Sequence, residues 1–238
     1  MNSGAGELHL IPVTLGDDNV SGVLPQGTRD VVAGLDYFIV ENAKSARAFL
    51  KHLPHPLPLR ELAVETFDKD GTAERAAALL QPVRAGRSAA VLSEAGCPAV
   101  ADPGARLVEA AHAAGIRVRP HVGPSALLLA LMASGFDGQH FEFHGYLPVP
   151  SAACRNKIVE LERESRARGT TQIFIETPYR NDALLRALLD TCADETRLCV
   201  ASGLTLPDET VSSATVREWR RRQVTIGRQP TVFLLFSR

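Results

Sequence analysis

The chain has 238 residues, of which 45% are hydrophobic and 22% charged, and its 26 basic and 27 acidic residues give a net charge of −1. This length suits one or two domains with a sizeable core, and the balanced charge excludes a globally basic nucleic-acid coat. The 4 cysteines include no C-x-x-C pair, which excludes a disulfide scaffold and a structural zinc finger. Without an apolar run of membrane-spanning length or signal-peptide features at the start, we expect a cytoplasmic protein that uses neither a membrane nor a metal.

Strand-like and helix-like segments alternate up to about residue 134. The predicted strands are Glu7–Val13, Asp36–Val40, Ser88–Leu92 and Arg117–His121. The predicted helices are Asn42–Leu53, Thr72–Ala85, Gly104–Ala114 and Ala126–Ser134. Repeated strand–helix units require right-handed crossovers, so this part of the chain predicts an α/β domain with a mostly parallel sheet.

The composition changes after residue 140, where the aromatic-rich segment Phe141–Tyr146 precedes a long charged helix over Ala152–Arg168. The later predicted elements are a strand, a helix and three strands: Thr171–Ile175, Asn181–Thr191, Arg197–Ser202, Thr210–Ala214 and Thr231–Phe236. They predict a second α/β domain with a mixed sheet. We place the boundary so that the domains span 1–121 and 122–238.

The segment Leu92–Gly104 (LSEAGCPAVADPG) is the most informative stretch of the chain. It follows a buried strand and precedes a helix, which places it at the sheet edge where open α/β folds bind ligands. Its small residues let the backbone approach a ligand closely. Glu94 and Asp102 could bond ligand hydroxyls or a cation; alternatively, the loop is a tight turn in which Asp102 caps the helix. Cys97 is better explained as a packed thiol than as a nucleophile.

A second strand-to-helix joint lies at Val122–Ala126 (VGPSA). Ser125 could cap the following helix, or it could offer its hydroxyl and the helix N-terminal amides to a ligand; as a lone motif, ordinary capping is favoured. We expect this loop and the loop after Leu92 to open on the same edge of the sheet.

Two other clusters carry weaker signals. His140 and His144 lack a carboxylate companion, so packing or surface roles are favoured over metal binding. The arginines at 217 and 220–222 beside Trp219 could touch RNA phosphate, but a solvated helix end is favoured.

Several motifs in one order carry a resemblance to a known family. Leu92–Phe136, Phe143–Pro148 (FHGYLP), Phe174–Arg180 (FIETPYR) and Leu204-Thr205 with Glu209 resemble the signature motifs of the RsmI-like branch of the tetrapyrrole methylase family. These are class III S-adenosylmethionine-dependent methyltransferases, and this branch methylates a cytidine ribose 2′-hydroxyl in 16S rRNA. The resemblance covers most of the chain from residue 88 to about 215.

The resemblance implies S-adenosylmethionine as cofactor, bound in the cleft between two α/β domains, and a homodimer. The donor-binding positions that it carries over fall mostly on small or apolar residues: Leu15, Ala95, Gly96, Cys97, Val100, Ser125, Ala126, Glu176, Leu204 and Pro230. Binding of the cofactor through backbone N–H and C=O groups would explain why the sequence has no charged cofactor-binding motif.

The chain departs from the branch pattern at Thr14–Asp18, Asn42–Lys44, Leu62–Asp70 and Leu206-Pro207. Donor binding is therefore better supported than methylation of ribosomal RNA. The ribose hydroxyl of small-subunit RNA is the first choice of acceptor. The alternatives are a small molecule such as a tetrapyrrole, or a protein that binds S-adenosylmethionine without transferring its methyl group. For a hydroxyl acceptor, Glu94 and Asp102 are the nearest candidates to receive the proton, and either could equally be structural.

Overall fold

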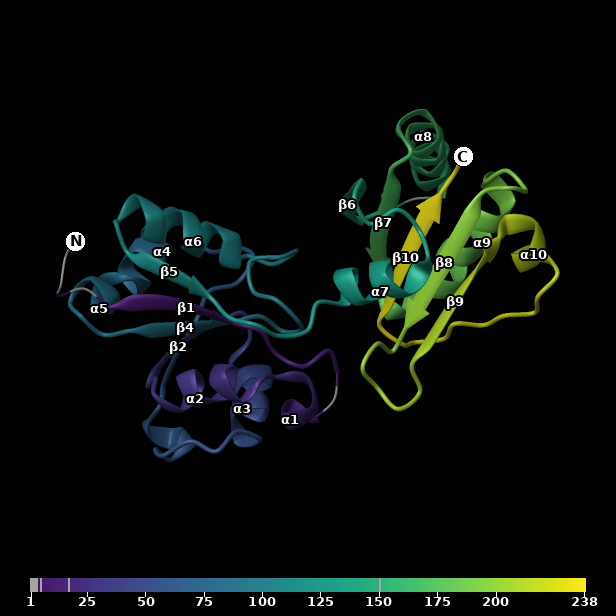
Figure 1. Ribbon diagram of the computed structural model, residues 1–238. Coiled ribbons are helices and arrows are strands. Elements are labelled where there is room, and N and C mark those ends of the chain that lie inside the picture. The colour runs from purple at the N-terminus through teal and green to yellow at the C-terminus, as the bar shows by residue number, and fades with distance from the viewer. Residues whose placement is uncertain (1–3, 5, 17, 150) are drawn as a thin grey trace. The chain divides into compact units, whose positions relative to one another are not determined.

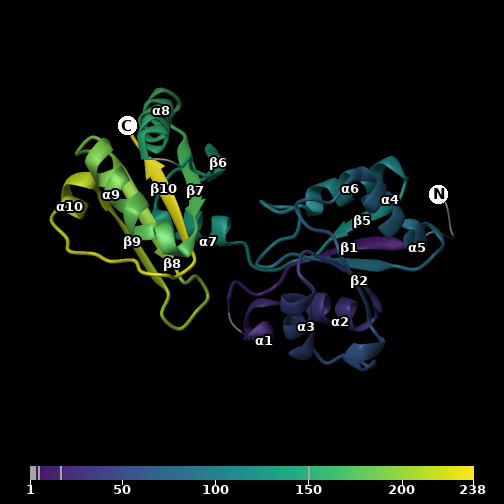
Figure 2. The ribbon, with the colours of Figure 1, turned by 180° about the vertical axis from the view of Figure 1, so that it is seen from behind.

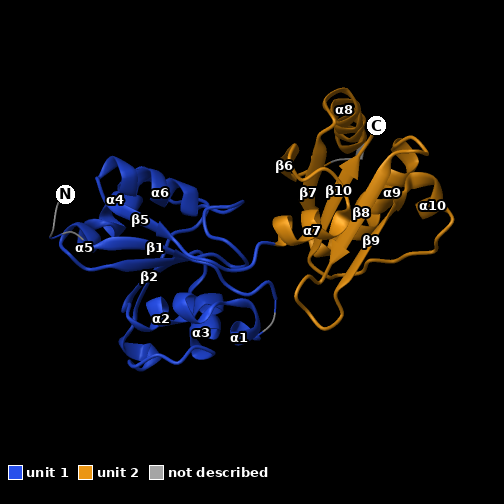
Figure 3. Cartoon of the chain, in the orientation of Figure 1, with its two compact units in different colours: residues 1–125 blue, residues 126–238 orange. Residues whose placement is uncertain are grey.

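The computed structural model describes residue 4 and residues 6–16, 18–149 and 151–238, so Asp17, within the atypical first turn, and Pro150 lie outside the described residues. The chain divides into two compact units, Met1–Ser125 and Ala126–Arg238 (Figure 3). Each unit contains one sheet with helices packed on it, which confirms the predicted α/β class.

The sheet of unit 1 has five strands, all parallel, in the order β3-β2-β4-β1-β5 (Figure 1). The strands are β1 (Glu7–Ile11), β2 (Tyr37–Val40), β3 (Ala63–Thr66), β4 (Ala89–Leu92) and β5 (Arg117–Pro120). Parallel strands all end at the same edge, so the loops that follow β1, β4 and β5 begin side by side.

Helices cover both faces of this sheet, as the two opposite views show (Figures 1 and 2). On one face lie α1 (Val20–Val23), α2 (Gln26–Ala33), α3 (Ala43–Lys51) and the short turn η1 (Leu59–Glu61). On the other face lie α4 (Ala73–Leu79), α5 (Gln81–Arg84) and α6 (Gly104–Ala113). Residues of β4 alternate between the two cores, with Ala90 and Leu92 on the first face and Ala89 and Val91 on the second. A central strand that is buried on both faces is apolar along its whole length, as β4 is.

The sheet of unit 2 is mixed, in the order β6-β7-β10-β8-β9. Its strands are β6 (Phe141–Tyr146), β7 (Thr171–Glu176), β8 (Arg197–Ser202), β9 (Thr210–Thr215) and β10 (Thr231–Phe236). β6 and β7 are parallel, and the other three pairs are antiparallel. This agrees with the predicted mixed sheet.

Unit 2 has a thick and a thin helical layer. The core beneath α8 (Ser151–Arg168), α9 (Asn181–Thr191) and α10 (Val216–Arg220) contains Phe174, Phe233 and Trp219. The helix α7 (Ala126–Ser134) packs against β8, β9 and β10 on the opposite face (Figures 1 and 2). The 3-10 turn η2 (Pro178–Arg180) joins β7 to α9.

Three features of unit 1 differ from the sequence prediction. The expected helix Thr72–Ala85 is two helices, α4 and α5, because Pro82 lies in the first turn of α5 and cannot continue a helix hydrogen-bond ladder. The strand β3 was not predicted, since it is an edge strand without buried residues and lacks a strong apolar pattern. The short helices α1 and α2 were not predicted either.

Candidate functional site

Three loops of unit 1 converge at the carboxyl edge of its sheet. The Val13 N–H, after β1, donates to the Gly96 carbonyl, after β4, at 2.9 Å. The Cys97 thiol in turn donates to the carbonyl of Pro124, after β5, at 3.4 Å. The structure therefore brings the loops after Leu92 and His121 together on one edge, as the sequence predicts.

Gly96 lies where these three loops meet. Its φ of +69° lies in the left-handed region that favours glycine. A Cβ at this position would lie 3.2 Å from Leu15 Cδ2 and 3.5 Å from the Pro124 carbonyl oxygen. The space beside Gly96 thus depends on the absence of a side chain, and Leu15, itself buried, borders it.

The same loop holds two alanines in the left-handed region, Ala99 at φ 66° and Ala101 at φ 59°. For a residue with a Cβ, this conformation costs roughly 1–2 kcal/mol. Asp102 supports it, because its Oδ1 accepts hydrogen bonds from the N–H groups of Ala99 at 2.8 Å and Gly104 at 2.7 Å. Gly104 begins α6, so Asp102 fastens the loop to the start of that helix, in the structural role that the sequence left open.

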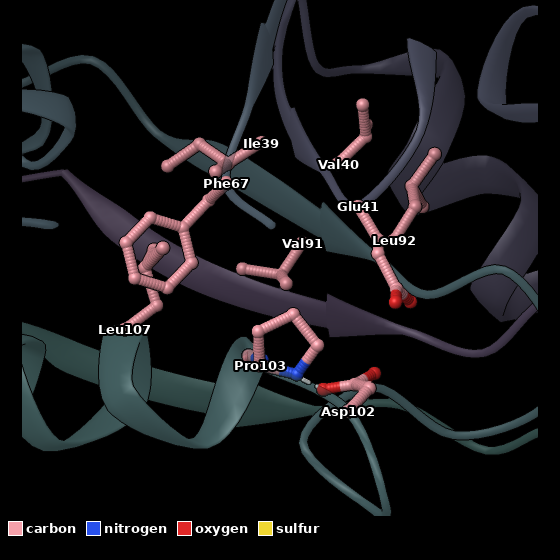
Figure 4. Close-up of a pocket in the computed structure, with 10 residues that line it drawn as sticks. Ile39, Val40, Glu41, Phe67, Val91, Leu92, Asp102, Pro103 and Leu107 are labelled. Atoms are coloured by element: carbon pink, nitrogen blue, oxygen red, sulfur yellow. Dashed lines mark hydrogen bonds between the residues drawn. The ribbon is translucent and has the colours of Figure 1, made fainter. Parts of the chain in front are cut away.

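Asp102 also borders a pocket beside this loop, together with Glu41 at the end of β2 (Figure 4). The pocket has an empty volume of about 220 Å³, open solvent included. Its apolar wall contains Ile39, Phe67, Val91 and Leu107. Burial raises the pKa of Asp102. Burial, followed by the nearby carboxylates of Glu94 and Asp102, raises the pKa of Glu41. Sequence reasoning did not single out Glu41, which follows an ordinary buried strand.

The other predicted positions of unit 1 differ in accessibility. Glu94 and Ala95 are exposed, and Val100 is 46% exposed. Ser125 and Ala126 are half-buried and lie where the two units join in the chain. Glu94 thus offers an accessible carboxylate beside the loop, whereas Asp102 is already engaged by backbone amides.

The three predicted positions of unit 2 also meet at one sheet edge. Glu176 is the last residue of β7 and pairs with Thr231 of β10. Thr231 directly follows Pro230 in the chain. The Pro230 carbonyl accepts a hydrogen bond from the N–H of Gly203 at 2.9 Å, and Leu204 follows Gly203. Residues remote in sequence thus gather at this edge.

Side-chain bonds hold this edge in place. Oε1 of Glu176, a residue only 9% exposed, accepts hydrogen bonds from Arg180 Nε at 2.9 Å and Nη2 at 2.7 Å. The fully buried Asn181 places Nδ2 within reach of the carbonyls of Gly227, at 3.1 Å, and Gln229, at 2.7 Å. The Glu176 carboxylate therefore already has a cationic partner.

Two buried polar atoms at this edge lack a hydrogen-bond partner within the described chain, Asn181 Oδ1 and Thr205 Oγ1. Thr205 also has a φ of 73°, which is unusual for a β-branched residue. Buried polar groups are normally hydrogen-bonded, so these atoms are available to a ligand or water. In unit 1, the small residues around Gly96 suit a ligand that is bound through backbone groups.

The weaker clusters have structural explanations. His144 bonds Gln172 through Nε2 at 2.6 Å, and His140 pairs with Asp137 at 3.2 Å. In the described parts of the chain, no group of three or more His, Cys, Asp or Glu side chains could hold a metal ion. Likewise, none of the helices described there is long and apolar enough to cross a membrane.

At the basic end of α10, two of the four arginines are paired with acidic residues, whereas Arg221 and Arg222 form no salt bridge within the described residues. Arg217 pairs with Asp194 and Glu195, and Arg220 pairs with Asp194. These contacts agree with the solvated helix end that the sequence favours over an RNA phosphate site.

Comparison with known proteins now bears on this arrangement. The family described as Tetrapyrrole (Corrin/Porphyrin) Methylases matches residues 20–219. The chain belongs to this family. It is similar to the Ribosomal RNA small subunit methyltransferase I of Vibrio cholerae, with 32% identity over 91% of this chain and 71% of that protein. The protein of the same name from Xylella fastidiosa is 35% identical over 90% of this chain and 74% of its own length.

The fold of this tetrapyrrole methylase is also seen in a solved structure. Uroporphyrin-III C-methyl transferase from Thermus thermophilus, complexed with S-adenyl homocysteine, has a TM-score of 0.55 and 18% identity. The match covers 97% of each chain. Family membership makes this chain a methyltransferase, and it confirms the resemblance stated from the sequence motifs.

Proposed function

We propose that this methyltransferase uses S-adenosylmethionine to methylate a ribose 2′-hydroxyl of small-subunit ribosomal RNA. The observation that carries the proposal is the convergence of the three unit 1 loops around Gly96. The names of the relatives from Vibrio cholerae and Xylella fastidiosa support the choice of acceptor.

In this proposal the donor contacts backbone groups of Ala95, Gly96 and Cys97, with Leu15 and Val100 beside them. Ser125 and Ala126 supply the start of α7, and Glu176, Leu204 and Pro230 contribute from unit 2. The glycine and alanines keep the backbone accessible, which suits a ligand bound through N–H and C=O groups. The partnerless oxygen atoms of Asn181 and Thr205 support a ligand at the second edge.

For methyl transfer, the protein mainly has to hold the donor and the acceptor in place and to exclude water. S-adenosylmethionine supplies a methyl group on a positively charged sulfur, which is already a strong electrophile. The loops have to orient the acceptor oxygen in line with that methyl group and keep water out. Asp102 serves this purpose by fixing the backbone of Ala99 and the start of α6.

A hydroxyl acceptor also has to lose its proton. Glu94 and Asp102 remain the candidates in this proposal, and the exposed Glu94 is the more accessible of the two. Asp102 retains one carboxylate oxygen, Oδ2, outside its two backbone bonds.

We further propose that the protein acts as a homodimer in the cytoplasm, as the family resemblance implies. Light scattering coupled to size-exclusion chromatography tests the homodimer directly. A mass of twice 25.6 kDa agrees with the proposal, and a monomer at working concentrations contradicts it.

The decisive experiment for the function is transfer of labelled methyl from S-adenosylmethionine. The purified protein is incubated with small ribosomal subunits that lack the modification and, separately, with a metabolite extract. Label in RNA that digests to a 2′-O-methyl nucleoside supports the proposal. Label in the small-molecule fraction alone, or donor binding without transfer to either, contradicts it.

A further inference from the structure

Two exposed tyrosines end neighbouring strands of unit 2. Tyr146 is the last residue of β6, and Tyr179 lies in η2, which follows β7. Because β6 and β7 are adjacent and parallel, the two side chains belong to the same sheet edge. This edge also carries Glu176, the last residue of β7.

Both tyrosine side chains are largely exposed to solvent, although large aromatic side chains are usually buried at least in part. Tyr179 is 70% exposed and Tyr146 is 56% exposed, whereas the chain's third tyrosine, Tyr37, is only 4% exposed. Tyr37 donates its hydroxyl to the Leu79 carbonyl, as a buried tyrosine normally does. Large exposed aromatic residues at one edge indicate a contact surface.

Arg180 makes this surface ordered. Its guanidinium lies 5.4 Å from the centroid of the Tyr179 ring, in a cation–π contact. The same guanidinium is anchored by two hydrogen bonds to the buried Glu176 carboxylate. The hydrogen bonds to Glu176 raise the pKa of Arg180, and the hydroxyls of Tyr179 and Tyr146 add smaller contributions of the same sign. The Tyr179 ring therefore lies against a guanidinium that is anchored by Glu176, and Tyr146 ends the neighbouring strand.

Further positive charge borders this edge from α8. Arg155 is exposed and forms no salt bridge within the described residues. β6 ends at Tyr146 and α8 begins only a few residues later, so Arg155, near the start of α8, lies towards the same edge. A free arginine next to exposed rings suits a phosphate-bearing partner.

We propose that Tyr146, Tyr179 and Arg180 form a stacking platform that receives unpaired bases of a single-stranded RNA acceptor. This inference rests on the proposed function and adds which part of the protein recognises the RNA and in which form. Sequence-independent binding of single strands combines aromatic rings that stack on bases with a basic groove along the backbone. Bases of a duplex are already stacked and cannot use such rings, so the platform selects a single strand.

The test measures binding of a fluorescein-labelled single-stranded RNA of about ten nucleotides by fluorescence anisotropy, with the same sequence as a duplex for comparison. We expect Tyr179→Ala and Tyr146→Ala each to weaken single-strand binding about ten-fold. Tyr179→Phe and Tyr146→Phe keep the ring and should bind within about two-fold of the unaltered protein. We also expect the duplex to bind more weakly and to be little affected by any of the four variants.

Phe141→Ala is the matched control, because Phe141 is also an exposed aromatic residue of β6, 44% exposed, but it begins the strand. It should leave RNA binding unchanged. Equal weakening by Phe141→Ala, no effect of the tyrosine-to-alanine changes, or equal losses from the phenylalanine variants would overturn the platform.

Titration of S-adenosylmethionine into the same variants separates this inference from the proposed function. Unchanged donor affinity together with weakened RNA binding supports the platform. Loss of donor affinity in Tyr179→Ala would place the ring in the donor site and overturn the platform while leaving the proposed function standing. A change in molecular mass without a change in RNA binding would make the edge a protein interface and would also overturn it. Failure of the proposed function is seen separately, in the methyl-transfer assay with the unaltered protein.

Discussion

The two units gather loops at a sheet edge by different means. In unit 1 the contacts are made largely by backbone atoms, as in the Val13-to-Gly96 hydrogen bond, and they depend on residues without side chains. In unit 2, beside the backbone bond from Gly203 to Pro230, side chains make most of the corresponding contacts, chiefly Asn181 and the Glu176–Arg180 pair. We therefore expect the stability of unit 1 to be sensitive to added side-chain atoms and that of unit 2 to be sensitive to removed ones.

The largest effect is expected from crowding Gly123, in the loop after β5. A Cβ there would lie 2.4 Å from Pro12 Cβ and 2.8 Å from Leu24 Cδ2. Gly123→Ala should therefore lower the free energy of unfolding by about 2–4 kcal/mol, measured by urea unfolding followed by circular dichroism. Gly27→Ala, on helix α2 with no atom within 4 Å of the added Cβ, should instead raise it by up to about 1 kcal/mol. Equal effects of the two changes would show that crowding is not what limits this loop.

Removing atoms from Asn181 should have the next largest effect. Asn181→Ala leaves the partly buried carbonyls of Gly227 and Gln229 without their side-chain donor. We expect a loss of about 2–3 kcal/mol of unfolding free energy. Asn156→Ala, at an exposed position of α8, should change it by less than about 0.5 kcal/mol. If both variants unfold at the same urea concentration, unit 2 does not depend on this side chain.

Asp102 tests whether a side chain in unit 1 acts by supporting the backbone. Asp102→Asn keeps an oxygen that can accept from the Ala99 and Gly104 N–H groups, so stability and donor affinity should change little. Asp102→Ala loses both bonds and should cost about 1–3 kcal/mol in urea unfolding. A variant Asp102→Asn that binds donor normally but no longer transfers methyl would instead make this carboxylate the proton acceptor.

The smallest expected effect is a difference in pH dependence between the two ends of β2. Burial raises the pKa of Glu41, so between its ordinary and raised values the folded protein binds more protons than the unfolded chain. Stability therefore falls as pH rises through this window, and Glu41→Gln should flatten the decline. At the other end, the Arg87 hydrogen bond lowers the pKa of Asp36, whose stabilisation is lost as pH falls through the lowered value; Asp36→Asn should remove that loss. Urea unfolding from about pH 2 to pH 7 covers both windows, because the Asp36 window lies below that group's ordinary pKa and the Glu41 window lies above its own; slopes of the same sign in the two windows would contradict the assignment.

The sequence predicts much of unit 1 because its signals are local. Glycine, proline and small residues after Leu92 and His121 have the turn chemistry that places a loop at the end of a parallel strand. Two apolar strands ended by such loops are sufficient to infer that the loops share an edge. The split at Pro82 follows from proline chemistry too, although the sequence prediction ran one helix through it.

The contacts of unit 2 could not be predicted in the same way. Asn181 forms hydrogen bonds with residues 46 and 48 positions away, and no local sequence pattern indicates these contacts. Glu41 is another example, because Glu94 and Asp102, which act on its pKa, come from a loop more than fifty residues later in the chain. Edge strand β3 has no buried face to generate a strong alternation, so its sequence carries little signal.

The most direct test of the central claim is a calorimetric titration of S-adenosylmethionine into two matched glycine variants. Gly96 and Gly115 have nearly the same φ, +69° and +67°, but a Cβ at Gly96 meets Leu15 and Pro124, whereas one at Gly115 meets nothing within 4 Å. Backbone strain is thus shared by the two variants, and only crowding differs. We predict that Gly96→Val loses at least about ten-fold in donor affinity while Gly115→Val binds like the unaltered protein. Equal donor affinity in both variants would contradict the claim that the unit 1 loops hold the donor.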